Sequence, residues 1–129
     1  MSEPQKKKTI LIADDDENAR IMCERELREE GYITHSASSG LEALEFIKKN
    51  PQIDLVVLDI KMPSLTGIQV LQQLRGKKVK IPVILYSDYS AYRNDFASDL
   101  ANANVVKSSD LTELKEKVKE LLNVSRKGD

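Results

Sequence analysis

Short apolar runs alternate with amphipathic stretches along this chain. Runs rich in Ile, Leu and Val at residues 10–13, 53–58 and 81–86 predict strands that are buried on both faces. Residues 32–36 and 104–106 predict two weaker strands. Apolar residues at three- and four-residue spacing predict five helices. Four of them cover 18–30, 40–49, 90–101 and 110–123, and the other lies in a segment that contains residues 67–74. This alternation predicts an α/β fold, a doubly wound five-stranded parallel sheet with helices on both faces.

The predicted elements fill one domain. The chain has 129 residues, 40% hydrophobic and 32% charged, which is typical of a globular domain that folds without a disulfide or a structural metal. Cys23 is the single cysteine and lies on the apolar stripe of the first helix, so we expect it to be buried. We expect a polar leader (1–8), one domain (9–124) and a short polar tail (125–129), with no output domain.

Charge and hydropathy exclude several classes of partner. Twenty Lys and Arg residues oppose 21 Asp and Glu residues, and a net charge of -1 provides no basic surface field for binding nucleic acid. Apolar runs stay well short of the roughly 18–20 residues that cross a membrane, and the N-terminus lacks the apolar core of a signal peptide. We therefore expect a cytoplasmic protein that binds neither nucleic acid nor membrane.

Four of the five predicted strands end in a chemically functional residue. Asp14 and Asp15 follow the first strand, Asp59 the third, Ser87 the fourth and Lys107 the fifth. Because parallel strands of an open α/β sheet place their carboxyl ends at one edge, where such folds bind ligands, we expect these side chains to converge.

The predicted cluster has the chemistry of a phosphoryl-transfer site. Three adjacent carboxylates repel one another unless a cation joins them, and Mg²⁺ accepts carboxylate oxygens while keeping positions for water and phosphate. Lys107 adds an ammonium group and Ser87 a hydroxyl donor, which a phosphoryl group requires. Asp59, at the end of the central strand, is the expected nucleophile.

Four segments carry a resemblance to a known family. The segments are, in chain order, ILIADD (10–15), LDIKMP (58–63), PVILYS (82–87) and VVK (105–107). In this order they resemble the receiver domain of two-component response regulators, and in particular stand-alone receivers of the chemotaxis type. The resemblance covers about residues 8–123. The resemblance implies the flavodoxin-like strand order 2-1-3-4-5.

The resemblance also implies a role for each site residue. Asp59 is the phosphoacceptor, and Ser87 and Lys107 contact the phosphoryl group. The implied ligands of Mg²⁺ are Asp14, Asp15, Asp59 and the backbone carbonyl of Lys61. Of these, Asp14 is implied to act mainly through a water.

The implied function is that of a phosphoacceptor signalling switch. A sensor histidine kinase, a phosphotransfer protein or a small phosphodonor supplies the phosphoryl group, and a downstream protein effector responds to it. The signal leaves through the face formed by residues 90–101, 104–106 and the last helix. Such a domain is not an enzyme with an external substrate, although it catalyses its own phosphotransfer and dephosphorylation. The resemblance leaves open whether the chain also forms a weak homodimer.

Two departures from the family pattern keep an alternative open. Ser108 follows Lys107 where receivers usually have a proline after a cis bond, and Asn104 replaces the aromatic residue that many receivers use as a switch. Tyr86, Tyr89 and Tyr92 are interpreted as packing or surface residues. The alternative is a receiver-like interaction module that works without phosphorylation. A Mg²⁺-dependent hydrolase is disfavoured because the chain has no cap domain.

Overall fold

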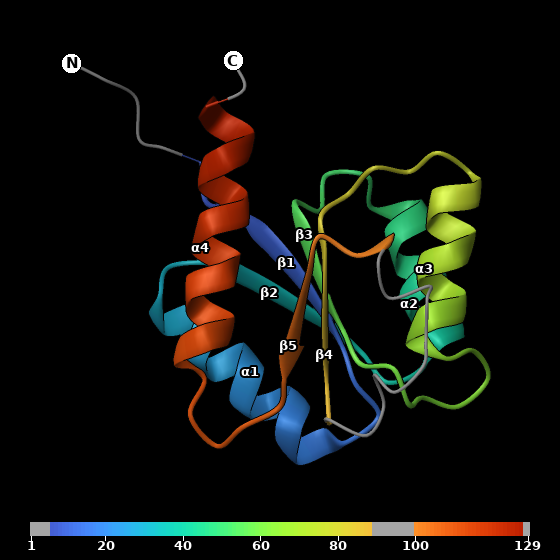
Figure 1. Ribbon diagram of the computed structural model, residues 1–129, viewed down its shortest axis with the longest axis horizontal. Coiled ribbons are helices and arrows are strands. Elements are labelled where there is room, and N and C mark those ends of the chain that lie inside the picture. The colour runs from blue at the N-terminus through green and yellow to red at the C-terminus, as the bar shows by residue number, and fades with distance from the viewer. Residues whose placement is uncertain (1–5, 89–99, 128–129) are drawn as a thin grey trace.

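The computed structural model describes residues 6–88 and 100–127. Five parallel strands pair in the order β2-β1-β3-β4-β5, which confirms the predicted fold class and strand order (Figure 1). The elements are, in chain order, β1 (Thr9–Ala13), α1 (Glu17–Glu29), β2 (Ile33–Ala37), α2 (Gly40–Lys49), β3 (Leu55–Leu58), α3 (Gly67–Gly76), β4 (Val83–Ser87), β5 (Ala103–Val106) and α4 (Thr112–Lys127).

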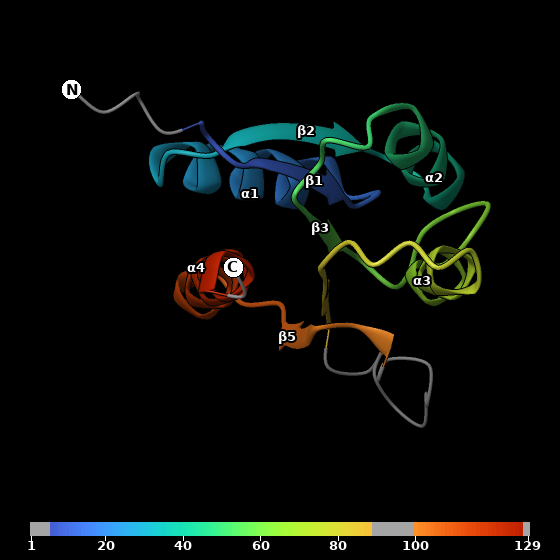
Figure 2. The same ribbon diagram turned by 90° about the horizontal axis from the view of Figure 1, so that it is seen from above.

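The sheet separates two apolar layers. Helices α1 and α4 cover one face of the sheet, and α2 and α3 cover the other (Figure 2). Successive side chains of a strand point to opposite faces, so Ile10 and Ile12 pack toward α1 and α4, whereas Leu11 and Ala13 pack toward α2 and α3. This explains why the central strands are apolar at every position rather than at alternate ones.

Turns and caps account for most shifts in element boundaries. The first helix begins at Glu17 because the Asp16 side chain accepts from the NH groups of Asn18 and Ala19 as the N-cap. The third strand begins two residues later than predicted, since the Ile53 NH donates to Asn50 within a turn. The fourth strand also begins two residues late, after Pro82, which has no NH to donate to a neighbouring strand.

Two helix predictions differ from the structure or fall outside it. Most of the helix predicted over 90–101, including Tyr92, lies outside the described residues, as does Tyr89; Leu100 and Ala101 are described and are not α-helical. The last helix runs to Lys127 rather than ending near residue 123, because neither Gly nor Pro interrupts it before Gly128. Within the described residues, no helix combines the length and the apolar character needed to cross a membrane.

The loop from β3 to α3 is held by close backbone contacts. A Cβ added at Gly67 would come within 2.0 Å of the Asp59 carbonyl oxygen, and one added at Gly40 within 2.1 Å of that of Leu65. Ser64 adopts a positive φ of 67°, and its hydroxyl accepts from the Leu41 NH at 3.2 Å. These contacts fix the loop that begins at Asp59 against the start of α2.

Burial of Cys23 predicts an unreactive thiol. The side chain is 2% exposed on the buried face of α1, and burial, with the nearby Asp14 charge, raises the pKa of the thiol to about 12. A raised pKa keeps the thiol neutral, so at pH 8 very little of it is the reactive thiolate. We expect an aromatic disulfide reagent at pH 8 to modify one thiol per chain only after a denaturant is added. Rapid modification of the folded protein would contradict this burial.

Candidate functional site

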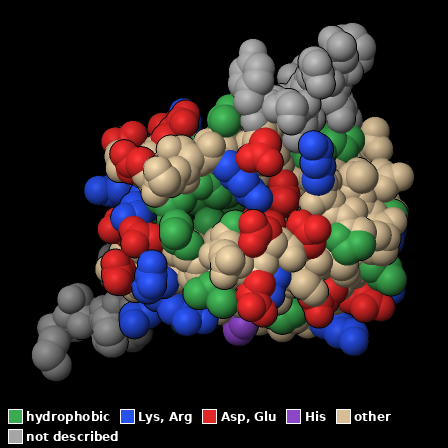
Figure 3. Space-filling view, turned by 90° about the horizontal axis from the view of Figure 1, so that it is seen from below, with side chains coloured by type: hydrophobic (Ala, Val, Ile, Leu, Met, Phe, Trp, Pro, Cys, Tyr) green, Lys and Arg blue, Asp and Glu red, His purple; other side chains and the backbone are tan. Residues whose placement is uncertain are grey.

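The predicted site residues converge at the carboxyl edge of the sheet. Asp14 and Asp15 follow β1, and Asp59 follows β3; one carboxylate oxygen from each lies within 4.8 Å of the other two. On this face of the molecule, acidic side chains gather near the centre beside basic ones (Figure 3). Asp14 and Asp59 are buried, whereas Asp15 is exposed to solvent.

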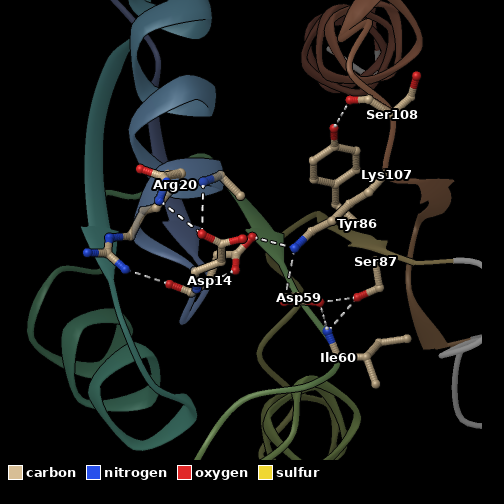
Figure 4. A network of polar contacts seen from close by, with 11 residues as sticks. Asp14, Arg20, Asp59, Ile60, Tyr86, Ser87, Lys107 and Ser108 are labelled. Carbon is tan, nitrogen blue, oxygen red and sulfur yellow. Dashed lines mark hydrogen bonds and ion pairs between the residues drawn. The ribbon is translucent and has the colours of Figure 1, made fainter.

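The Asp59 carboxylate is held on both of its oxygens (Figure 4). Oδ1 accepts from the Ser87 hydroxyl and, at 2.7 Å, from the NH of Ile60. Oδ2 lies 3.2 Å from Nζ of Lys107. The Ser87 hydroxyl in turn accepts from the Ile60 NH at 2.6 Å. The carboxylate is therefore oriented by its neighbours although only 7% of Asp59 is exposed.

Lys107 joins the two buried carboxylates. Its Nζ lies 2.8 Å from Oδ2 of Asp14 as well as near Asp59, and its side chain is 18% exposed. Burial alone would lower the pKa of Lys107, but the hydrogen bond to Asp14 and the charge of Asp59 outweigh it and raise that pKa above its ordinary value. Lys107 therefore stays protonated and neutralises charge that would otherwise be unpaired in the site.

Asp14 has a raised pKa for a different reason. Burial raises the pKa of this carboxyl, and the negative charge of Asp59 adds to the effect, although the hydrogen bonds from Lys107 and the Asp16 NH oppose it. The Asp16 NH donates to Oδ1 of Asp14 at 2.9 Å. The site thus holds more negative charge than its own lysine balances, which favours a bound cation.

Two contributors were not predicted from the sequence. The first is Arg20 on α1, whose Nη1 donates to the Asp14 carbonyl at 2.8 Å and holds the chain in place just after β1. The second is the NH of Ile60, which donates to both Asp59 and Ser87. A main-chain NH leaves no mark in the sequence. The only signal for Arg20 is a base one turn into the helix that follows the acidic pair.

Departures from the family pattern have structural consequences. No cis peptide bond occurs among the described residues, so Lys107 and Ser108 are joined in trans. The Ser108 carbonyl accepts from the Tyr86 hydroxyl at 3.4 Å. Tyr86 is buried, in agreement with its interpretation as a packing residue, and burial raises its pKa to about 12. Asn104 is exposed on β5, opposite Leu85 of β4.

The donor set fits Mg²⁺. Three carboxylates that converge within 4.8 Å offer hard oxygen ligands, and Asp15 keeps the cluster open to solvent. Mg²⁺ binds such oxygens and retains waters in its remaining positions. No Cys or His belongs to this cluster, so its chemistry does not favour zinc.

Comparison with known proteins assigns a family to this geometry. Residues 10–119 match the family model for the response regulator receiver domain. The chain belongs to this family. The resemblance found in the four sequence segments is thereby confirmed, and the chain is a receiver domain of two-component signalling.

Relatives of this receiver include short and long proteins. Sporulation initiation phosphotransferase F of Bacillus subtilis is 34% identical over 115 residues, which are 88% of this chain and 92% of that protein. The sensor kinase CckA of Brucella abortus is 33% identical over 117 residues, also 88% of this chain, yet the chain spans only 12% of CckA. The family thus includes receivers that form most of a protein and receivers within much longer ones.

Solved structures are similar over nearly the whole receiver. The response regulator TrrA of Thermotoga maritima, determined in complex with Mg²⁺-BeF, is 47% identical and matches with a TM-score of 0.82, covering 89% of this chain and 99% of that one. TrrA also matches, at 46% identity and the same TM-score, in a complex with the histidine kinase ThkA, with 89% and 98% covered.

Proposed function

We propose that this receiver is a phosphoacceptor switch that accepts a phosphoryl group on Asp59. The observation that carries the proposal is the oriented Asp59 carboxylate, which lies between the Ser87 hydroxyl and the Lys107 ammonium beside two further carboxylates. The donor would be a sensor histidine kinase, a phosphotransfer protein or a small phosphodonor. The complex of TrrA with ThkA supports a kinase partner, and a downstream protein effector in the cytoplasm would receive the signal.

The reaction is displacement at phosphorus. A carboxylate oxygen of Asp59 forms a bond to phosphorus while the bond to the donor's nitrogen or oxygen breaks, and the donor group leaves with that electron pair. Lys107, which stays protonated, would pair with an oxygen of the transferred group. Ser87 would turn its hydroxyl from the carboxylate to a second phosphoryl oxygen. The hydrogen-bond donors that would stabilise the negative charge of the transferred phosphoryl group, Lys107 and Ser87, therefore lie beside the nucleophile before transfer.

Magnesium fits the ligand set described above. Asp14, Asp15 and Asp59 would hold Mg²⁺, with Asp14 acting mainly through a water; their convergence and the complex of TrrA with Mg²⁺-BeF support Mg²⁺ binding. The family resemblance adds the Lys61 carbonyl to the proposed ligands. The ion would supply the positive charge that offsets repulsion between Asp59 and an anionic donor. The receiver would in this way promote its own phosphotransfer and the later hydrolysis.

Removal of Mg²⁺ tests the switch against the interaction module. After incubation with Mg²⁺ and acetyl phosphate, we expect intact mass spectrometry to show one phosphoryl adduct per chain. With EDTA in place of Mg²⁺ the adduct should be lost. An adduct that forms equally in EDTA would contradict the Mg²⁺ role, and no adduct in either sample would favour the module that works without phosphorylation.

The raised pKa of Asp14 predicts a pH dependence of Mg²⁺ binding. Mg²⁺ needs the ionised carboxylate, and a pKa above the usual 3.8 lets protons compete at higher pH than at an exposed aspartate. We expect the Mg²⁺-induced rise in thermal midpoint to be full at neutral pH and to shrink as pH falls, beginning above pH 3.8. The midpoint without Mg²⁺ at each pH is the reference. A rise that shrinks only over the pH range in which an ordinary aspartate with a pKa of 3.8 titrates would contradict this account.

A further inference from the structure

A large cavity lies at the opposite end of the sheet from Asp59. Its volume is about 900 Å³, and it extends from α2 and the end of α3 to the segments that precede β3 and β4. The apolar residues of its wall include Leu44, Ile47, Ile53, Leu74, Val79 and Ile81. Cavities of this size with mostly apolar walls and a few polar groups bind small organic ligands.

The rim of the cavity carries more positive than negative charge. Lys48 on α2 and Lys77 and Lys80 after α3 line it, together with Glu45 and Asp54. Oδ2 of Asp54 accepts from the Thr9 NH at 2.8 Å, so that oxygen is engaged by the start of β1. All three lysines are exposed. A ligand with a negative group at the rim and an apolar body inside therefore complements the cavity.

Arg75 holds the wall of the cavity in place. Its Nη1 donates to the carbonyls of Val79 at 2.7 Å and Ile81 at 3.0 Å, while Nη2 donates to the side chain of Asn102 at 3.0 Å. The Val79 NH donates to the Leu74 carbonyl at 2.8 Å. These bonds fix the segment between α3 and β4 without a ligand, so binding would require little reordering of the chain.

We propose that this cavity binds a monomeric anionic amphiphile, a straight-chain carboxylate such as decanoate. The alkyl chain would lie against the apolar wall and the carboxylate at the lysine rim. A membrane surface fits less well, because Ile47, Ile53 and Leu74 in the wall are buried, and because recruitment to anionic lipid typically uses clusters of about four to eight bases, more than the three lysines here. The site is separate from Asp59, and the proposal does not depend on phosphorylation.

Amide NMR spectra of the whole chain, titrated with decanoate below its micelle concentration, test the proposal. We expect saturable shifts at Leu44, Val79 and Ile81 and smaller ones at Asp59. Decyltrimethylammonium carries the same alkyl chain with a positive head and should bind more weakly. No saturable shift with decanoate, or equal binding of the two amphiphiles, would overturn the proposal. Retention on anionic vesicles without a decanoate shift would point to a membrane contact and overturn it as well.

Charge reversal at the rim provides a second measurement. The double variant Lys48→Glu, Lys80→Glu should bind decanoate about tenfold more weakly, since two favourable charge contacts become repulsive. Lys7→Glu with Lys119→Glu changes net charge equally at exposed positions that do not line the cavity, and should bind like the parent. Far-UV circular dichroism verifies that both variants fold. Equal affinity in the two double variants would overturn the assignment of the rim.

Discussion

Replacing Asp59 with Asn should abolish the phosphoryl adduct that the parent forms with Mg²⁺ and acetyl phosphate. An amide has nearly the size and shape of a carboxylate but is not a nucleophile toward phosphorus. The variant should nevertheless fold. Asp14 and Asp59 are two buried carboxylates that share the Lys107 ammonium, and the substitution removes only one of these charges. Lys107 therefore keeps an ion pair, because Asp14 remains 2.8 Å from its Nζ. Intact mass after a fixed incubation measures the loss, and urea denaturation shows that the fold is retained.

Asp16→Asn is the matched control for this experiment. Asp16 lies at the same edge of the sheet, but its side chain caps α1, and Asn caps helices about as well as Asp. This variant should form the adduct to the same extent as the parent. A full adduct on Asp59→Asn would place the phosphoryl group on another residue and remove the basis of the proposed switch.

Replacing Gly67 with Ala should reduce both stability and phosphorylation. The new Cβ would lie 2.0 Å from the Asp59 carbonyl oxygen and 2.8 Å from its carbonyl carbon, and these backbone atoms cannot rotate away as a side chain could. The Gly67 NH also donates to the Ile60 carbonyl at 2.8 Å, so the loop and the helix start must separate. We expect a loss of about 1–3 kcal/mol in the free energy of unfolding. Adduct formation should also slow, since the shift moves Asp59.

Gly76→Ala supplies the comparison for this substitution. A Cβ at Gly76, the last residue of α3, meets no atom within 4 Å. Alanine favours helix over glycine, so this variant should be unchanged or more stable by up to about 1 kcal/mol. Urea denaturation followed by circular dichroism measures both variants. Equal stability of the two would show that the β3–α3 loop yields easily and that the contact is unimportant.

The convergence of the site followed from the sequence because each component ends a strand. Once the strands are parallel, Asp14, Asp59, Ser87 and Lys107 must meet at one edge, and the structure places them within hydrogen-bond or ion-pair distance. The order of the strands did not follow from the pattern and came from the family resemblance. A pattern of apolar runs identifies strands but contains no information on which strands are neighbours.

The features that were missed depend on backbone atoms or on contacts between distant segments. The Ile60 NH in the site and the positive φ of Ser64 are properties of the main chain, which side-chain patterns do not report. The lysine rim of the cavity joins α2 to the end of α3 and the turn that follows it. Each lysine alone looks like an ordinary exposed base, and only the fold brings them around one apolar wall.

The buried position of Cys23 makes this receiver convenient for single-site labelling. Because the chain has one cysteine and that thiol is 2% exposed, a cysteine introduced on the surface would be the only one open to a maleimide under native conditions. A fluorophore could therefore be attached at the rim of the cavity or beside the Asp59 site without first removing the native cysteine. Ligand binding and phosphorylation could then be followed separately, each through its own dye.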